Sequence, residues 1–347
     1  MQFEFTEEQR MIADMVGEFT AAEGTSERVR NAMATERGYL METWQTMIQD
    51  LALPGLLIPE AAGGQELSMV EAALVFEQLG RSLLPSPLLS TAVFSAGVLR
   101  LLDGNETLKQ IASGEITATS SVLAGGKGDF VLDASTSDVL ILLDQDGGSL
   151  YLAEQGDPNV LIEPVATLDQ TRRFAHVFVS DFSELQLLAR GDVAADAVAA
   201  GFDCARIALA AEAVGAAQTC LERTVSYTKD RIQFGRAIGS FQAVKHQMAD
   251  MMVETEAAIS AVYFAACAIS EGHVDASSLA AMAKVQASQA LSFCAGRMIQ
   301  LHGGIGFTWE HDAHLFFKRA RSTSNLFGSN AELDDMIATE IGLGVRL

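Results

Sequence analysis

The stretch Asp230–Met252, DRIQFGRAIGSFQAVKHQMADMM, gathers two arginines, a lysine and three glutamines in a strongly acidic chain. The whole sequence has 23 Lys and Arg against 45 Asp and Glu, a formal net charge of −22. A helical pattern ends at DRIQFG, where Arg231 and Gln233 lie, and resumes at Phe241 after GRAIGS. The sequence therefore predicts a cluster of polar groups at a junction between two helices.

A second junction of this kind follows at Ile299–Glu310, IQLHGGIGFTWE. Gln300 closes a helix there, and Gly303, Gly304 and Gly306 would let backbone amides approach a ligand without obstruction by side chains. An arginine presents a fixed fork of donors that suits a diphosphate, so Arg231 and this glycine segment together favour a diphosphate site. The alternative is that Arg231 only interacts with carbonyl groups at the C-terminus of its own helix.

The order of sequence patterns along the chain predicts a mainly α protein with a small β domain. Residues 1–114 have helical periodicity, and residues 115–188 contain short β-like runs, DVLILL, SLYLAE and AHVFVS, separated by turn compositions. Residues 189–347 are again helical, in long alanine-rich segments. We expect an N-terminal helical domain, a small middle β domain and a C-terminal helical bundle.

Composition excludes several classes of function. An acidic chain lacks the basic face that nucleic acids require, and the N-terminus MQFEFTEEQR lacks the positive region of a secretory signal. No long uncharged apolar run predicts a membrane span, so we expect a soluble cytoplasmic protein. The four cysteines lack the close spacing of metal or disulfide frameworks, and His311 and His314 beside Glu310 have no third partner at a suggestive spacing, so no metal site is predicted.

The motifs of both junctions are similar to those of the acyl-CoA dehydrogenase family. That family has R-x-Q-F-G followed by F-Q and A-D-M, and later Q-x-x-G-G-x-G, and both motifs occur here in order. The resemblance extends along nearly the whole chain, through LLPSPLL, SGEITA, LDQTRRFAHVFV and AAEAVGAAQ. It implies an N-terminal helical domain, a middle β domain and a C-terminal four-helix bundle.

The resemblance also implies a cofactor, FAD, that lies across a subunit interface. One subunit would then hold the diphosphate and adenosine half of a flavin whose ring lies in its partner. The residues that the resemblance assigns to this contact are Arg231, Gln233, Phe234, Gln300, Gly303 and Gly304.

The chain departs from the family where the catalytic base is expected. Most members place a glutamate just before a G-T near the C-terminus, and Phe327 occupies that position here, ahead of Gly328. A minority place the base early in the first long C-terminal helix, where this chain has Ala205. Glu212 lies seven residues beyond Ala205 on the same helix face and is a candidate for a displaced base, a role that another acid could also take.

The middle domain departs as well, because the family's T-E-P-x-A-G-S-D and W-x-x-N segments, which line the flavin ring, are not recognisable between Thr117 and Asp138. The chain therefore resembles the non-catalytic subunit of bacterial heterotetrameric acyl-CoA dehydrogenases, some of which act on steroid side-chain thioesters. We expect an α2β2 assembly with a homologous full-length subunit that holds most of the acyl-CoA. The alternatives are an active homo-oligomer that uses Glu212 and a structural paralogue that binds no cofactor. Phe327 can be a core residue as well as a replacement for the base, and these two interpretations are compatible.

Overall fold

The computed structural model describes residues 4–102 and 106–343, and its contacts divide the chain into two compact units. One unit consists of residues 1–26, 69–84 and 206–347, and the other of residues 27–68 and 85–205. Each unit therefore combines segments that lie far apart in the sequence.

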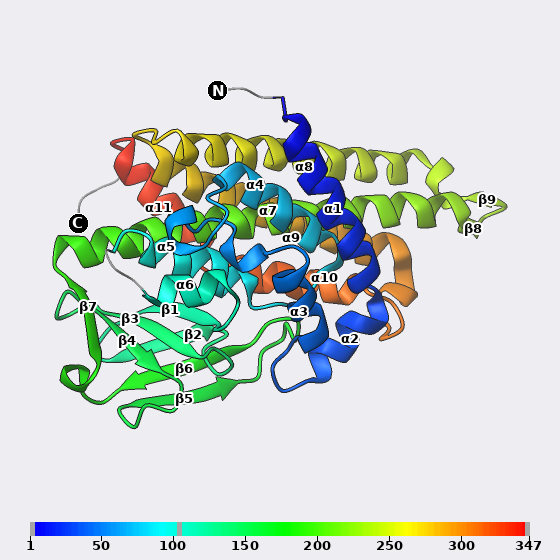
Figure 1. Cartoon of the computed structure of the whole chain (residues 1–347). Coiled ribbons are helices and arrows are strands. Elements are labelled where there is room, and N and C mark those ends of the chain that lie inside the picture. Colours follow the sequence, from blue (N-terminus) through cyan, green and yellow to red (C-terminus); the bar gives the residue numbers. More distant parts are fainter. Residues whose placement is uncertain (1–3, 103–105, 344–347) are drawn as a thin grey trace. The chain divides into compact units, whose positions relative to one another are not determined.

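The first unit is helical, and its long helices run beside one another, with a small hairpin projecting at one end (Figure 1). Alanine-rich sequence favours such long helices and lets them pack closely. Two shorter helices begin with capping boxes, made by Thr6 with Gln9 and by Ser329 with Glu332. The helices are α1 (Glu7–Glu23), α4 (Met69–Ser82), α7 (Asp192–Asp230, of which residues up to Ala205 belong to the second unit), α8 (Gln242–Ser270), α9 (Ala276–His302), α10 (Ala313–Thr323) and α11 (Asn330–Glu340); the hairpin strands are β8 (Ile232–Gln233) and β9 (Arg236–Ala237).

Glycine allows α4 and α7 to cross in close contact. A Cβ atom at Gly215 of α7 would overlap the backbone carbonyl of Glu77, and one at Gly80 of α4 would overlap that of Glu212. Because both obstacles are backbone atoms, neither helix has a flexible group that can move aside.

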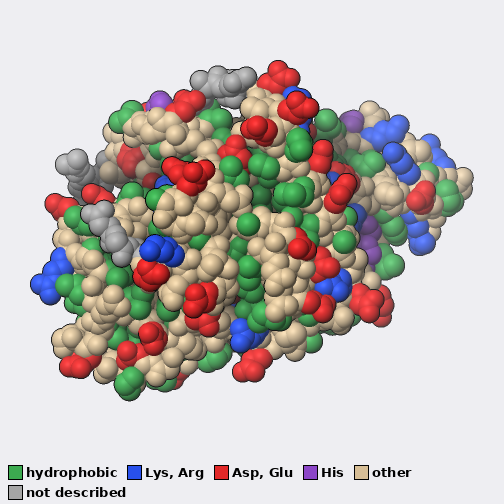
Figure 2. Space-filling model, in the orientation of Figure 1, with side chains coloured by type: hydrophobic (Ala, Val, Ile, Leu, Met, Phe, Trp, Pro, Cys, Tyr) green, Lys and Arg blue, Asp and Glu red, His purple; other side chains and the backbone are tan. Residues whose placement is uncertain are grey.

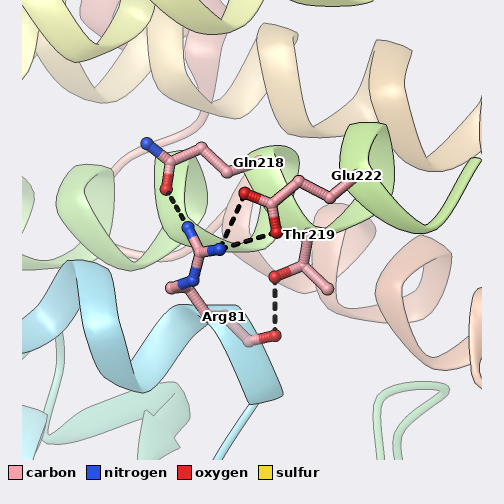
Figure 3. A network of polar contacts seen from close by, with 4 residues as sticks. All are labelled: Arg81, Gln218, Thr219 and Glu222. Atoms are coloured by element: carbon pink, nitrogen blue, oxygen red, sulfur yellow. Dashed lines mark hydrogen bonds and ion pairs between the residues drawn. The ribbon is translucent and has the colours of Figure 1, made fainter. Parts of the chain in front are cut away.

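Arg81 joins the same two helices at the end of α4 (Figure 3). Its guanidinium donates to Oε1 of Gln218 at 2.7 Å and to the two carboxylate oxygens of Glu222 at 2.7 and 2.6 Å. Thr219 Oγ1 donates in return to the carbonyl of Arg81 at 2.8 Å. These bonds fix the register of α4 along α7.

The second unit contains two small sheets packed around a shared apolar core. One sheet has the order β1-β3-β4-β7, with β1 and β3 parallel, and the other has the antiparallel order β2-β6-β5. Core side chains come from both sheets, among them Leu123, Val131, Leu140 and Val177. The strands are β1 (Ala118–Leu123), β2 (Lys127–Leu132), β3 (Val139–Asp144), β4 (Ser149–Glu154), β5 (Val160–Val165), β6 (Phe174–Val179) and β7 (Gln186–Arg190); the helices of this unit are α2 (Ser26–Ala34), α3 (Met41–Gln49), the π-helical η3 (Leu89–Ser95), α5 (Ala96–Leu99) and α6 (Glu106–Ala112).

The expected fold class, mainly α with a small β domain, is confirmed. The three predicted β runs form β3, β4 and β6, and the segment Thr117–Asp138, in which no family motif was recognisable, carries β1 and β2. The division at residues 114 and 188 remains a prediction, and the two compact units cut across it.

One helix of the described chain, α8, is long and apolar enough to cross a membrane by length and composition alone. A core helix of a water-soluble protein passes the same test, and α8 packs against α4 and α9 in its unit. Its composition is therefore weak support for a membrane span.

Replacing Gly215 with alanine will test the helix crossing. We expect Gly215→Ala to lower the free energy of unfolding by about 1–3 kcal/mol, because the added methyl group overlaps a backbone carbonyl. The matched control is Gly296→Ala in α9, where a Cβ meets nothing within 4 Å and the better helix propensity of alanine should add up to about 1 kcal/mol. Urea denaturation of both variants measures the difference, and equal midpoints would contradict the close crossing.

Candidate functional site

The first predicted junction is a two-residue hairpin that follows α7. Gln233 pairs with Arg236 across it, and the two residues between them, Phe234 and Gly235, both have positive φ, 52° and 78°. Successive positive φ values fit the tight turn of a β-hairpin, but a phenylalanine rarely adopts this conformation. Phe234 is nevertheless 90% exposed at the tip of the hairpin. An aromatic residue with a strained backbone and a solvent-exposed side chain is typical of a contact residue rather than of a core residue.

The second predicted junction is the end of α9. The helix ends at His302, and Gly303 follows with φ 64° and ψ −143°, a conformation that only glycine adopts readily. A Cβ atom on Gly303 or Gly304 would meet nothing within 4 Å, so the space beside this backbone is open. Gly306 differs, because a Cβ there would lie 3.0 Å from the carbonyl oxygen of Ile299, which makes it a packing residue.

The two junctions meet through an aromatic stack. The ring of Tyr227, in the last turn of α7, lies 4.3 Å from that of His302 with an interplanar angle of 22°, and its hydroxyl donates to the carbonyl of His302 at 3.3 Å. The ring centre of His311 lies 4.6 Å from that of His302. Nδ1 of His302 donates to the carbonyl of Met298 at 2.7 Å. Arg231 follows Tyr227 by one helical turn, and Gln300 precedes His302 by two residues. The structure therefore brings the two predicted halves of the site to the same end of the helical unit.

Cations without acidic partners gather at this end. Figure 2 shows Lys and Arg side chains concentrated at the end that carries β8 and β9, whereas acidic side chains are spread over the rest of the visible face. Within the described part of the chain, five cations of the two junctions form no ion pair: Lys229, Arg231, Arg236, Lys245 and Arg297. Arg223, which lies near His302, is paired with Asp312. In a chain with a charge of −22, such a cluster favours an anionic ligand or partner.

Two of these arginines are held in place by aromatic rings. The guanidinium of Arg236 lies 4.1 Å from the ring centre of Phe241, and that of Arg297 lies 5.0 Å from the ring centre of Phe293. Stacking orients a guanidinium while it leaves the N–H groups at its edge for other acceptors.

Arg231 does not cap its own helix in the part of the chain that the structure describes. Its backbone N–H donates to the carbonyl of Tyr227 at 2.9 Å, but its guanidinium makes no hydrogen bond to a described carbonyl of α7. This geometry favours the ligand interpretation of Arg231 over the capping interpretation.

Neither family position for a base carries a proton acceptor. Phe327 is 7% exposed and has φ 57°, and its carbonyl accepts a hydrogen bond from Nε of Arg206 at 3.1 Å. Ala205 is fully buried within α7.

Glu212, the candidate for a displaced base, forms an ion pair with Arg319 of α10. Both side chains are buried. A buried guanidinium stabilises the carboxylate anion and so opposes the protonation that a general base must undergo. This pairing disfavours Glu212 as a base.

His311 and His314 pack against other aromatic rings. His311 packs on His302, and His314 makes an edge contact with Trp309 at 4.7 Å. Among the described residues, no group of three or more His, Cys, Asp or Glu side chains is arranged to hold a metal ion.

Comparison with known proteins gives the family. The model of the acyl-CoA dehydrogenase N-terminal domain matches residues 6–116, and that of the C-terminal domain matches residues 195–342. The acyl-CoA dehydrogenase IpdE2 of Mycobacterium tuberculosis is 38% identical over 336 residues, which cover 96% of this chain and 98% of the relative. The chain belongs to the acyl-CoA dehydrogenase family.

Two solved structures have the same fold as this acyl-CoA dehydrogenase chain. A variant of the Tcur3481–Tcur3483 steroid ACAD matches with a TM-score of 0.86 and 26% identity, over 96% of this chain and 98% of that one. The ChsE4–ChsE5 complex from Mycobacterium tuberculosis matches with a TM-score of 0.87 and 24% identity, over 98% and 99% of the two chains.

Members of the acyl-CoA dehydrogenase family bind FAD. The residue types at the two junctions fit the diphosphate half of that cofactor, because cations without ion-pair partners and glycines whose backbone is open to a ligand lie at the same end of the helical unit.

The sequence pattern did not identify every residue that builds this site. Tyr227 and His302 join its two halves, but their stacking links positions that are far apart in the sequence. Arg236 lies inside the quoted motif, and its pairing with Gln233 across the hairpin is the signal that identifies it. Arg297 lies one turn before Gln300 on α9, and only that helical spacing relates it to the site.

The junction of this acyl-CoA dehydrogenase chain should be sensitive to acid through His302. Burial lowers the pKa of His302 below its ordinary value of 6.5, and the neighbouring His311 and Arg223 act in the same direction, although the hydrogen bond to the carbonyl of Met298 opposes them. The unfolded chain therefore binds a proton more readily, so this contribution to stability is intact above pH 6.5 and is lost as pH falls through the folded-state pKa. We expect the urea midpoint to fall more between pH 7 and about pH 5.5 in the wild type than in His302→Gln. Parallel pH profiles for the two proteins would contradict this.

Proposed function

We propose that this chain is a subunit of a heteromeric acyl-CoA dehydrogenase and holds the diphosphate and adenosine half of an FAD that is bound mainly by a homologous partner subunit. The observation that carries the proposal is the coexistence of two features. Cations without ion-pair partners and open glycine backbone occur at the joined ends of α7 and α9, while Phe327 and Ala205 occupy the positions of the base.

The chain's own residues account for binding but not for proton transfer. Arg231 offers a permanent charge and a fork of N–H donors to a diphosphate, and the side-chain amides of Gln233 and Gln300 offer neutral donors. Gly303 and Gly304 allow backbone N–H groups to approach the phosphate oxygens. The exposed ring of Phe234 supplies an apolar surface for the adenosine or for the partner.

Desaturation of an acyl-CoA needs a group that takes the α-proton of the thioester. Bound FAD supplies the acceptor for the hydride from the β-carbon. A buried phenyl ring and an alanine methyl group accept no proton, and Glu212 is paired with Arg319, so the partner must supply the base. The product would be the α,β-unsaturated thioester.

Similarity to the Tcur3481–Tcur3483 steroid ACAD supports two finer points of the proposal. That protein is named for two components and for a steroid substrate class. We infer by analogy that this chain assembles with an unlike subunit and that the substrate is a bulky steroid side-chain thioester. The proposal also includes an α2β2 stoichiometry and a cytoplasmic location, which the family resemblance and the sequence predict.

The first test is the flavin content of a complex co-expressed with a homologous full-length subunit. Arg231→Ala should weaken FAD retention about tenfold to a hundredfold, because a hydrogen bond to a charged group contributes about 1.5–3 kcal/mol. Absorbance of the flavin relative to protein, measured after dilution, gives the retained fraction.

Arg190→Ala is the matched control, since Arg190 lies at the end of β7 and outside both junctions. An unchanged flavin content in Arg231→Ala would favour a structural paralogue without a cofactor role. If this chain purified alone with stoichiometric flavin and oxidised an acyl-CoA, the half-site proposal would be wrong.

A second test separates the half-site subunit from an active homo-oligomer. We expect Glu212→Gln to leave turnover of the assembled complex within about twofold of the wild type, because glutamine still accepts a hydrogen bond from Arg319 and no proton transfer depends on this position. The initial rate with an artificial electron acceptor measures turnover. Loss of activity with an unchanged unfolding midpoint would instead assign Glu212 as the base.

A further inference from the structure

Lys284 of α9 is among the largest fully buried side chains in the described chain. Its Nζ donates three hydrogen bonds, to the carbonyl of Ser324 at 2.9 Å, to the carbonyl of Gly328 at 2.6 Å and to Oδ1 of Asn330 at 3.0 Å. An ammonium group has three N–H donors, so these bonds use all of them.

This burial has a cost, because removing an ammonium group from water disfavours its charge. Burial lowers the pKa of Lys284 to about 8, the charge of Arg206 acts in the same direction, and Glu332 opposes both. A methionine would fill the same space without a charge. The advantage of lysine at this position therefore lies in the oxygens that it binds.

The oxygens belong to a segment with an unusual backbone. Phe327 and Gly328 have successive positive φ values, 57° and 104°, and a large side chain such as that of Phe327 strains this conformation. A Cβ on Gly328 would lie 3.0 Å from the side chain of Leu333, so the segment is also closely packed. Such a backbone persists only where its surroundings hold it.

The surroundings supply two cations from two helices. Nε of Arg206, on α7, donates to the carbonyl of Phe327 at 3.1 Å, next to the carbonyl of Gly328 that Lys284 binds. Ser324 is the C-cap of α10, where orphan carbonyls favour a positive charge, and Asn330 is the first residue of α11. Lys284 thus connects α9 to the end of one helix and the start of the next.

We propose that Lys284 and Arg206 form a latch that holds the segment Ser324–Asn330, locks the left-handed backbone at Phe327 and Gly328, and so positions the side chain of Phe327. Lys284 and Arg206 are positioning residues that act through backbone oxygens. The latch holds the segment whether or not a cofactor is bound, because it includes none of the residues of the two junctions.

The test is hydrogen exchange of the assembled complex, read by mass spectrometry on peptides that cover residues 324–330. Lys284→Met should increase exchange in this segment at least tenfold, because the three oxygens lose their donors. Lys109→Met, an exposed lysine of α6 paired with Glu106, is the control and should leave the segment unchanged. Flavin content should be equal in all three proteins, which separates the latch from the cofactor contact.

A double-mutant cycle distinguishes a latch from simple filling of space. Glycine at position 327 adopts positive φ without strain, so the fold increase in the unfolding equilibrium constant caused by Lys284→Met should be at least fivefold smaller in the Phe327→Gly background. Additive effects, or unchanged exchange in Lys284→Met, would overturn the proposal. If Lys284→Met does not fold, Arg206→Met decides: faster exchange confined to the segment supports the latch, and unchanged exchange refutes it.

Discussion

The contact of backbone with backbone at Gly80 and Gly215 is the constraint on which the helical unit depends. It lets α4 approach α7 without intervening side chains, and Arg81 then fixes the register with three residues of α7. Because α7 is continuous to Asp230, its position also determines where its last turn lies. That turn carries Tyr227, whose stack on His302 brings the end of α9 beside the hairpin. A packing constraint inside the unit thus determines the geometry of a site at its end.

Sequence motifs predicted residues for the proposed site but not how the two junctions come together. The glycines at 303 and 304 and the exposed polar residues of the hairpin follow from local chemistry, since helix ends and turns have recognisable compositions. The stack of Tyr227 on His302 depends on the packing of two long helices, which no local pattern encodes. The same limit explains β1 and β2, whose sequences contain serine, threonine and glycine and therefore lack a strong alternation of apolar residues.

The segment around Phe327 has a well-supported backbone but no side chain that could act as a base. Sequence alone placed an apolar residue where a base is expected, and the structure adds that the residue is buried and has a strained backbone. The burial of Lys284 could not be predicted from the sequence, because lysine is normally exposed and a single lysine in an alanine-rich helix indicates a surface position. This segment carries no base, yet its backbone is held by a buried cation, Lys284, and a partly buried one, Arg206. The support of this backbone therefore does not depend on a proton-accepting side chain at position 327.

Charge limits what this chain can bind and where. With a net charge of −22, two copies repel each other at long range, and so do this chain and a free anionic cofactor. At physiological salt such repulsion fades beyond about 8 Å, so contact depends on the charges at the contact itself. The cations at the end of α7 and α9 have no acidic partners among the described residues, so an anion that reaches them displaces no internal ion pair. A diphosphate that is already fixed in another protein suits this surface. It brings two negative charges to the place where this surface is positive, and the other protein bears most of the cost of ordering the cofactor.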